Sequence, residues 1–264
     1  MDVLVLPGPD ACGRAVADAV TAVVAPGGPV TLGLATGSSP LPAYRELVRR
    51  HRADGLSFAA AQAFLLDEYL GLPAGHPQTY RQVIRRELTG HLDIDPDAVH
   101  GPDGTAPDPE RAAARYEQLL ARSGPVDVQI LGIGTNGHIG FNEPGTPPSS
   151  LTRVATLTAR TRADNARFFD RPADVPHRVI TQGLGTIRRA RHLVLVATGA
   201  GKAAAVAAAV QGPVTPDVPA SVLQAHPHCT LVLDDAAAGG LHGAVTGDRH
   251  PAGLPWSGAR KGHR

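Results

Sequence analysis

Short apolar runs alternate along the chain with longer stretches in which apolar residues recur at helical spacing. The short runs are typical of buried strands and lie at residues 3–6, 30–35, 63–66, 127–132, 153–157, 192–198 and 229–233. The longer stretches predict helices at residues 9–25, 41–50, 76–88, 107–122, 160–169, 185–190 and 202–210. We interpret residues 175–183 as a connecting segment. Strands that alternate with helices predict an α/β fold with a doubly wound, mostly parallel sheet that is covered on both faces.

The chain shows no internal repeat and no linker, so we expect one domain over residues 1–248. Residues 249–264 are rich in Gly, Pro, His and Arg, which predicts a disordered tail. Apolar residues make up 42% of the 264 residues, and the net charge of +1 predicts no attraction to nucleic acid or to a membrane. Cys12 and Cys229 have no metal-binding spacing and fit a reducing compartment. Because the first residues contain no long apolar run, we expect a cytoplasmic protein.

Residues 127–146 join a predicted strand to a glycine-rich turn and to two side chains that can move protons. Three glycines allow a tight turn and a close approach of a ligand to the backbone: Gly132, Gly134 and Gly137. His138 and Glu143 follow the turn. Ligands of open α/β sheets bind beyond the carboxyl ends of the strands. The stretch therefore predicts one edge of an active site.

Two simpler interpretations of this stretch compete with catalysis. The glycines match the dinucleotide-binding fingerprint, which also requires a helix after the third glycine and an acidic residue about 20 positions later. Pro144 prevents a long helix after Gly137, and residues 153–157 offer no acid. Alternatively, His138 only caps a turn, although the nearby Glu143 favours a catalytic histidine.

Two loops at predicted strand ends have the character of phosphate-binding sites. In the first, backbone N–H groups, hydroxyl groups and a helix dipole converge at Thr36, Gly37, Ser38 and Ser39. The alternative is that Ser39 and Pro40 only cap the following helix. The second loop ends in Lys202, one of two lysines in the chain, at a predicted helix N-terminus. An ammonium group opposes the helix dipole there, and it is tolerated more easily if it faces an anion.

Lys202 does not lie in a Walker A motif, because Val196 and Ala203 occupy positions where that motif needs Gly and Ser or Thr. Arg167 offers a bidentate phosphate donor, unless it only belongs to a solvated helix face. Since no Mg²⁺ cage accompanies these residues, they favour a static phosphate handle over phosphoryl transfer.

Asp67 and Glu68 follow a predicted strand, and adjacent side chains of a continuing strand point to opposite faces. One carboxylate can then face a pocket while the other is structural. Because Asp67 follows the apolar residues 64–66, we expect a raised pKa that suits a general base. The alternative is an acid that caps a turn or a helix.

Taken together, these stretches resemble the glucosamine-6-phosphate deaminases. The matching segments run in order between residues 3 and 235, at 32–44, 66–73, 131–144, 161–169, 199–202 and 219–227. The resemblance implies a modified Rossmann-like fold shared with phosphogluconolactonases. It implies conversion of glucosamine 6-phosphate and water to fructose 6-phosphate and ammonia in amino-sugar catabolism. It also implies an amino-sugar phosphate as the bound partner, no cofactor and no metal, and it allows a homo-oligomer.

The resemblance also assigns roles to individual residues. It makes Asp67 the base at the C2 proton, His138 the ring-opening catalyst and Glu143 the partner of His138. It places the phosphate contacts at the loop of Ser38 and Ser39, at Arg167 and at Lys202. Imidazole can take a proton from O1 and deliver one to the ring oxygen near neutral pH. Many family members have Asp where this chain has Asn136, but Asn can still hydrogen-bond His138, so we expect an active enzyme.

Two other functions fit parts of this pattern. A 6-phosphogluconolactonase needs a catalytic histidine but no carbon-acid chemistry, and its Gly-His turn continues in a Ser-Leu-Phe-Pro-like run that differs from residues 141–144. A non-catalytic sugar-phosphate sensor keeps the phosphate loops and can lack Asp67 or His138. Both residues are present, which favours the deaminase.

The pattern of regulated family members is incomplete in this chain. Those members bind N-acetylglucosamine 6-phosphate at a second basic site between subunits. Arg153 matches part of that site, but Ala155 stands where Lys is expected and the aromatic C-terminal segment is missing. We therefore expect no allosteric control.

Overall fold

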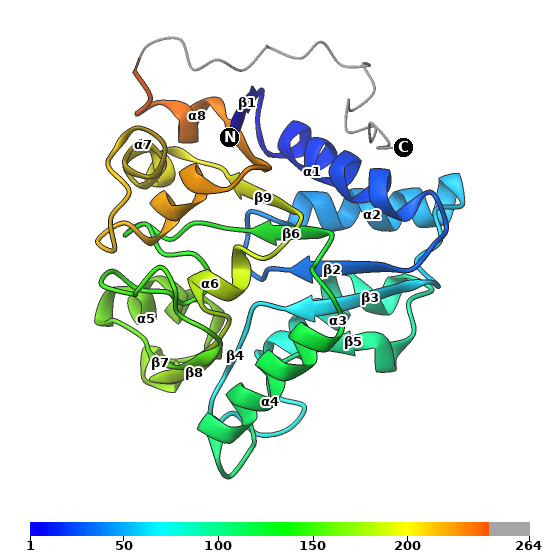
Figure 1. Ribbon diagram of the computed structural model, residues 1–264, viewed down its shortest axis with the longest axis horizontal. Helices are drawn as coiled ribbons and strands as arrows, with labels where there is room; N and C mark the ends of the chain where they lie inside the picture. Colours follow the sequence, from blue (N-terminus) through cyan, green and yellow to red (C-terminus); the bar gives the residue numbers. More distant parts are fainter. Residues whose placement is uncertain (243–264) are drawn as a thin grey trace.

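A parallel sheet forms the centre of the computed structural model, which describes residues 1–242 (Figure 1). Across those residues the sheet has seven strands, in the spatial order β1 (Asp2–Leu6), β10 (Cys229–Asp234), β9 (His192–Ala197), β6 (Val128–Leu131), β2 (Val30–Leu34), β3 (Ala61–Leu65) and β5 (Val99–His100). Neighbouring strands all run parallel, so their carboxyl ends meet at one edge. The expected domain end at residue 248 and the expected tail at residues 249–264 lie outside the described residues.

The helices follow from amphipathic stretches of the sequence. The buried side chains of α1 (Pro9–Val24) recur at helical spacing, and this helix contacts β6, β9 and β10. It also packs closely on α2 (Leu41–Asp54), because a Cβ atom on Gly13 would lie 2.6 Å from Pro42 Cβ. The other α-helices of the described residues are α3 (Tyr80–Glu87), α4 (Pro109–Arg122), α5 (Ala159–Asn165), α6 (Leu184–Ile187), α7 (Ala203–Gln211) and α8 (Asp235–Ala238). No helix in this part of the chain is long and apolar enough to cross a membrane.

A smaller antiparallel sheet continues directly from the parallel one. Its spatial order is β4 (Asp67–Tyr69), β8 (Arg178–Thr181) and β7 (Arg153–Thr156). Only Leu66 separates β3 from β4. The chain therefore passes from one sheet to the other at the residue predicted to be the base.

The sequence pattern predicted most elements but missed short ones. The interpretation of residues 175–183 as a connecting segment is wrong, because residues 178–181 form the central strand of the small sheet. The strands β4 and β5, of three and two residues, were also missed. The helix expected at 76–88 begins only at Tyr80, and the helix expected at 160–169 ends at Asn165 and continues as a short 3-10 turn. Such short segments contain too few residues to show a hydrophobic period.

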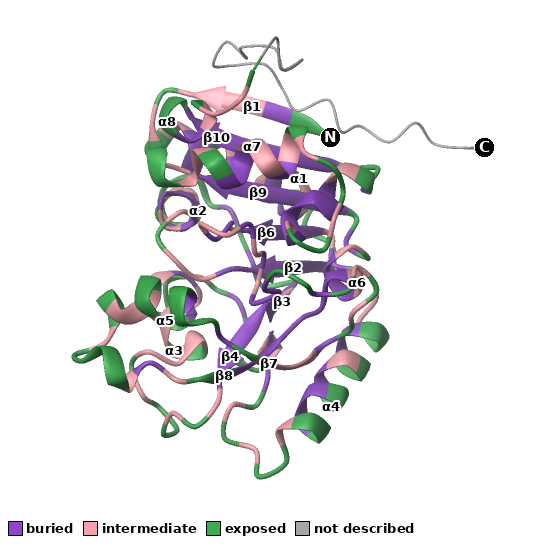
Figure 2. Cartoon of the chain, turned by 90° about the vertical axis from the view of Figure 1, so that its left-hand side faces the viewer, coloured by how far each residue is buried: buried purple, intermediate pink, exposed green. Residues whose placement is uncertain are grey.

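The parallel sheet is the core of the described chain. Every residue of β2, β6, β9 and β10 is buried, and Figure 2 shows these central strands in the colour of buried residues. Strands that are covered on both faces need continuous apolar runs instead of an alternating pattern. The prediction of a doubly wound, mostly parallel sheet is confirmed.

Candidate active site

Four neighbouring strands bring the predicted loops together at the carboxyl edge of the sheet. The strands β9, β6, β2 and β3 lie side by side in this order. The segments that follow them hold, in the same order, residues 199–202, 132–145, 35–40 and Asp67. Candidate residues that are far apart in the sequence therefore lie at one edge, as expected for a ligand site of an open α/β sheet.

Asp67 lies at the start of β4, where it pairs with Thr181 of β8. The residue is only 6% exposed, and a Cβ atom on Gly140 would lie 3.7 Å from Asp67 Oδ2. Burial, together with the negative charge of Glu68, raises the pKa of Asp67 well above its ordinary value. A carboxylate in this environment is a stronger base than an exposed one.

Glu68 has a structural role, as the strand geometry predicted for one of the two acids. Its carboxylate accepts hydrogen bonds from the backbone N–H groups of Tyr69, Tyr80 and Arg81 at 2.8, 2.9 and 3.0 Å. Tyr80 and Arg81 are the first residues of α3. Glu68 therefore satisfies a helix N-terminus, and Asp67 on the opposite side of the strand is left for chemistry.

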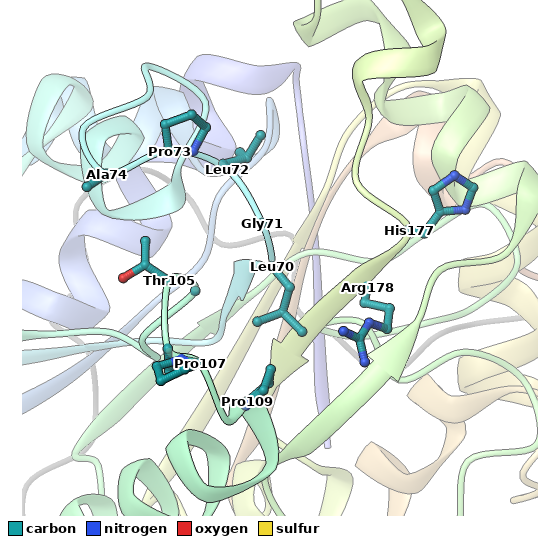
Figure 3. A pocket seen from close by; sticks show the side chains of 12 residues that line it. Leu70, Gly71, Leu72, Pro73, Ala74, Thr105, Pro107, Pro109, His177 and Arg178 are labelled. Carbon is teal, nitrogen blue, oxygen red and sulfur yellow. The ribbon is translucent and has the colours of Figure 1, made fainter.

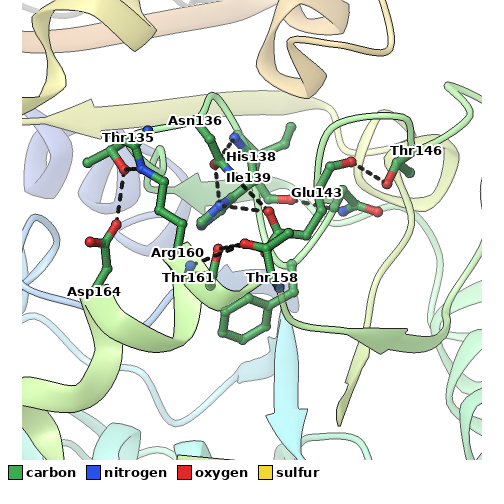
Figure 4. A network of polar contacts seen from close by, with 12 residues as sticks. Thr135, Asn136, His138, Ile139, Glu143, Thr146, Thr158, Arg160, Thr161 and Asp164 are labelled. Atoms are coloured by element: carbon green, nitrogen blue, oxygen red, sulfur yellow. Dashed lines mark hydrogen bonds and ion pairs between the residues drawn. The ribbon is translucent and has the colours of Figure 1, made fainter. Parts of the chain in front are cut away.

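His138, Asn136 and Glu143 form one hydrogen-bonded group in the loop after β6 (Figure 4). Asn136 Nδ2 donates to Glu143 Oε2 at 2.7 Å, so the amide oxygen of Asn136 faces the imidazole. That oxygen lies 2.7 Å from His138 Nδ1, whereas Glu143 Oε2 lies 3.7 Å away from it. Because a carbonyl oxygen only accepts, Nδ1 of a neutral His138 carries the proton. His138 Nε2 is then the basic nitrogen that can accept a proton from a ligand.

Glu143 keeps its negative charge at all ordinary pH values. Burial alone raises the pKa of this carboxyl, but the polar contacts with His138, Thr161 and Asn136 lower it to about 2. The other oxygen, Glu143 Oε1, accepts from the backbone N–H and the hydroxyl of Thr158 at 3.3 and 3.2 Å. Asn136 has no charge of its own, but it connects the imidazole to this fixed anion.

Thr158 and Thr161 were not predicted to take part in the site. Thr158 is the N-cap of α5, and its hydroxyl accepts from the backbone N–H of Thr161 at 3.2 Å. The pattern of a threonine before a predicted helix marks such a cap. It does not reveal that the capped helix end also holds Glu143, which is a tertiary contact.

Two glycines of the loop allow the side chain of His138 to take its position. A Cβ atom on Gly134 would lie 2.2 Å from His138 Cε1, so only glycine allows the ring to lie on the backbone here. Gly137 has a φ of 84°, which glycine adopts easily. The residues after Gly137 form turns and no helix, which argues against the dinucleotide-binding interpretation.

Lys202 reaches from the end of β9 to the loop after β6. Its Nζ donates to the carbonyl oxygen of Ile133 at 2.7 Å. Burial lowers the pKa of Lys202, the charge of Asp164 raises it and the charge of Arg167 lowers it, so all three charged groups lie within electrostatic reach. Arg167 is exposed and lies over the ring of Phe168, 4.7 Å from its centre. The structure thus brings the two predicted phosphate donors near each other.

The loop after β2 places Thr36, Gly37, Ser38 and Ser39 beside these groups, because β2 and β6 are neighbours. Ser39 does not cap α2, since the N-cap is Pro40 and no side chain caps this helix end. Gly37 has a φ of 105°, and the hydroxyl of Thr36 hydrogen-bonds that of Tyr80. The serine hydroxyls therefore lie in a loop that is shaped by its glycine and held by its threonine.

Comparisons with known proteins agree with this geometry. The family model described as glucosamine-6-phosphate isomerases/6-phosphogluconolactonase matches residues 9–232. The chain belongs to this family. A glucosamine-6-phosphate deaminase of Rhodococcus opacus (strain B4) is 57% identical over 241 residues, which cover 91% of this chain and 93% of the relative. The resemblance to the deaminases is thereby confirmed.

Solved structures of the isomerase and lactonase family share the fold. A monomeric glucosamine-6-phosphate deaminase superposes with a TM-score of 0.90 at 38% identity, over 91% of this chain and 100% of that one. The 6-phosphogluconolactonase from Trypanosoma brucei gives a TM-score of 0.73 at 21% identity, over 91% and 98% of the two chains, which shows a common fold alone. The prediction that this chain has a modified Rossmann-like fold, shared with the phosphogluconolactonases, is confirmed.

Arg153, the residue that matches part of the effector site of regulated family members, makes contacts within this chain. It is partly buried, and its guanidinium donates to Asn142 Oδ1 at 2.8 Å and to Thr146 Oγ1 at 3.2 Å. Burial lowers the pKa of Arg153. In this family member, Arg153 braces the segment on both sides of Glu143.

A cleft of about 700 Å³ lies apart from these residues (Figure 3). Its walls come from residues 70–74, residues 104–107, Pro109, His177 and Arg178, and no predicted site residue lines it. Within residues 1–242, no group of three or more His, Cys, Asp or Glu side chains is arranged to hold a metal. The candidate site is therefore defined by its chemistry and its place in the sheet, and not by cavity size.

Proposed function

We propose that this protein converts glucosamine 6-phosphate and water to fructose 6-phosphate and ammonia in the cytoplasm. The observation that carries the proposal is that two side chains suited to proton transfer lie at one edge of the sheet. One is the buried Asp67, and the other is the oriented imidazole of His138. A lactonase needs only the second, and a sensor needs neither. The proposal is also supported by the 57% identity to a protein named as a deaminase.

The imidazole suits the first step, which opens the pyranose ring. His138 Nε2 takes the proton from the O1 hydroxyl, and the imidazolium then delivers a proton to the ring oxygen as the C1–O5 bond breaks. The positive charge that His138 carries between the two transfers is stabilised by the anionic Glu143 through Asn136. The product is the open-chain aldehyde.

The buried carboxylate suits the second step, in which a proton moves from C2 to C1. Asp67 removes the C2 proton to give an enol with an amino group at C2, and protonation at C1 gives the imine of the ketose. Water adds to C2, and the C2–N bond breaks to release ammonia. A raised pKa makes Asp67 basic enough for a carbon-bound proton.

The proposal is tested by ammonia release from glucosamine 6-phosphate, measured beside galactosamine 6-phosphate and 6-phosphogluconolactone. Ammonia from the first sugar supports the deaminase. Hydrolysis of the lactone without ammonia release supports the lactonase, and binding without turnover supports a sensor.

Removing either predicted phosphate donor should weaken substrate binding. For Lys202→Ala and Arg167→Ala, we expect KM for glucosamine 6-phosphate to rise by about 10- to 100-fold, because each change removes a charge-assisted contact of roughly 1.5–3 kcal/mol. Initial rates over a range of substrate concentrations measure the effect. Arg122→Ala, at the end of α4, is a matched control that should keep the parent KM.

Unphosphorylated glucosamine provides the internal comparison for the same variants. It should be a poor substrate of the parent and should respond little to either substitution. If both variants keep the parent KM for the phosphorylated sugar, the phosphate site lies elsewhere.

We expect hyperbolic kinetics without activation by N-acetylglucosamine 6-phosphate. An effector must bind one global state better than another, typically by about 1–3 kcal/mol. The donors of Arg153 are already engaged by Asn142 and Thr146, and Ala155 offers none. The C-terminal segment that the sequence analysis also considered lies outside the described residues.

Rate-versus-substrate curves with and without the acetylated sugar phosphate measure this expectation. A sigmoidal curve that the effector makes hyperbolic would reveal a regulatory site that uses other residues. Because such a site would lie between subunits, the oligomeric state of the same samples should be measured by light scattering.

A further inference from the structure

The helix α5 is attached to the site loops at three places. Its N-cap holds Glu143, as described above. Near its end, Asn165 Nδ2 donates to the hydroxyl of Tyr69 in β4 at 2.9 Å. Between these points, two side chains of the helix meet the single hydroxyl of Thr135, which belongs to the loop after β6.

The hydroxyl of Thr135 both donates and accepts a hydrogen bond (Figure 4). It donates to Asp164 Oδ2 at 3.0 Å and accepts from Arg160 Nε at 3.0 Å. Arg160 and Asp164 are four residues apart on α5, so they lie on the same face of the helix. One neutral hydroxyl thus bridges a cation and an anion of the helix, and we call these three residues the Thr135 clasp.

The clasp connects the two sides of the proposed phosphate site. On the loop side, Thr135 follows Ile133 by two residues, and the Ile133 carbonyl oxygen holds Lys202. On the helix side, Asp164 precedes Arg167 by three residues, and the charges of both act on Lys202. A change in the position of α5 against the loop must therefore change the distance between the two cations.

The fold of the loop does not depend on the Thr135 side chain. The backbone N–H of Gly134 donates to the His138 carbonyl, and that of Gly137 donates to the Gly134 carbonyl. Arg160 and Asp164 are both exposed. The clasp is therefore a surface contact that can be removed while the structure behind it is kept.

We propose that Thr135 is a positioning residue that holds α5 against the catalytic loop and so sets the separation of Arg167 and Lys202 for a phosphorylated sugar. This inference rests on the proposed function. It predicts an effect on substrate affinity and not on the proton transfers, because the clasp touches neither Asp67 nor the imidazole of His138.

The test is Thr135→Val, which keeps the shape of the side chain and the charge of the protein. We expect KM for glucosamine 6-phosphate to rise about 3- to 10-fold, as for the loss of an ordinary hydrogen bond, while kcat stays within about twofold. Thr135→Ser, which keeps the hydroxyl, should restore the parent KM. Thr105→Val is the matched control, because the Thr105 hydroxyl donates to Asp103 at 2.8 Å on an exposed turn away from the site.

A second variant removes the clasp from the helix side. The double substitution Arg160→Ala with Asp164→Ala removes one charge of each sign, so the net charge is unchanged. It leaves no group that can hydrogen-bond Thr135 and alters only exposed residues, so it should fold even if Thr135→Val does not. It should reproduce the rise in KM. Hydrogen exchange of the amides in residues 159–168 should accelerate in both variants, and this readout needs no catalysis.

The outcomes separate the inference from the proposed function. A parent that releases no ammonia disproves the function, and the exchange data then decide whether the clasp holds α5. A parent KM in the folded valine variant or in the double variant overturns the inference. A loss of kcat at constant KM also overturns it, because Thr135 would then act on the chemical steps.

Discussion

Replacing Asp67 with Asn should abolish deamination and leave sugar-phosphate binding largely intact. An amide cannot accept the C2 proton, and the loss of a general base costs about 10²- to 10⁴-fold in rate or more. The phosphate donors lie on other segments, so affinity for glucosamine 6-phosphate, measured by calorimetry, should change little. Turnover within tenfold of the parent would remove Asp67 from its assigned role. Asp54→Asn, at the exposed end of α2, is the control for the same chemical change.

The raised pKa of Asp67 gives this prediction a second, independent signature. Catalysis requires the ionised carboxylate, so kcat/KM of the parent should fall as the pH is lowered through a pKa above the ordinary value of about 3.9. Folding stability depends on pH in the opposite way, because the native state is more stable when the Asp67 carboxyl is protonated. The stability that this group contributes is complete below about pH 3.9 and is lost as the pH rises through the raised pKa. Asp67→Asn should therefore melt at a higher temperature than the parent on the alkaline side, and a lower melting temperature there would contradict the assigned environment.

Replacing His138 with Gln should slow turnover by about 10²- to 10⁴-fold, because ring opening then lacks its proton carrier. Glutamine can still hydrogen-bond Asn136, so the loop should keep its shape. The affected step can be identified with substrate that carries deuterium at C2. When ring opening limits the rate, the isotope effect on kcat/KM should approach one, since the C2 bond breaks later.

The matched control for this variant is His51→Gln. His51 Nδ1 hydrogen-bonds the Leu56 carbonyl oxygen at 2.8 Å near the end of α2, far from the catalytic loop in the sequence and outside its contacts. It should behave as the parent. A large isotope effect in a slow His138→Gln variant would place the histidine at the C2 proton transfer instead of at ring opening.

The local pattern of the sequence was sufficient to predict six of the seven strands of the main sheet and the edge at which the candidate residues lie. Long apolar runs indicated the buried strands, and the glycine turn after residue 131 indicated where His138 and Glu143 lie. Strand geometry also predicted that one of the adjacent acids at 67 and 68 is structural, as Glu68 is. These features depend on residues that are neighbours in the chain, so periodicity and turn chemistry can reveal them.

The remaining features depend on contacts between distant segments. The strand β8 was missed because its four residues acquire strand geometry from pairing with β4 and β7. The contacts of Arg153 could not be predicted because its partners, Asn142 and Thr146, belong to a different segment. The same is true of Thr135, whose partners on α5 come 25 and 29 residues later. No sequence period connects such residues.

The pairing of β1 with β10 has a consequence for how the protein is made. Asp2 pairs with Thr230, so β1 finds its partner only when the chain has been synthesised beyond residue 230. At roughly 5–20 residues per second, this delay is about 10–45 s. During that time β1 is an unpaired strand that can join foreign edges. Truncation before residue 229 should therefore give aggregation-prone chains, and a chaperone that binds early in translation should raise the yield of active protein.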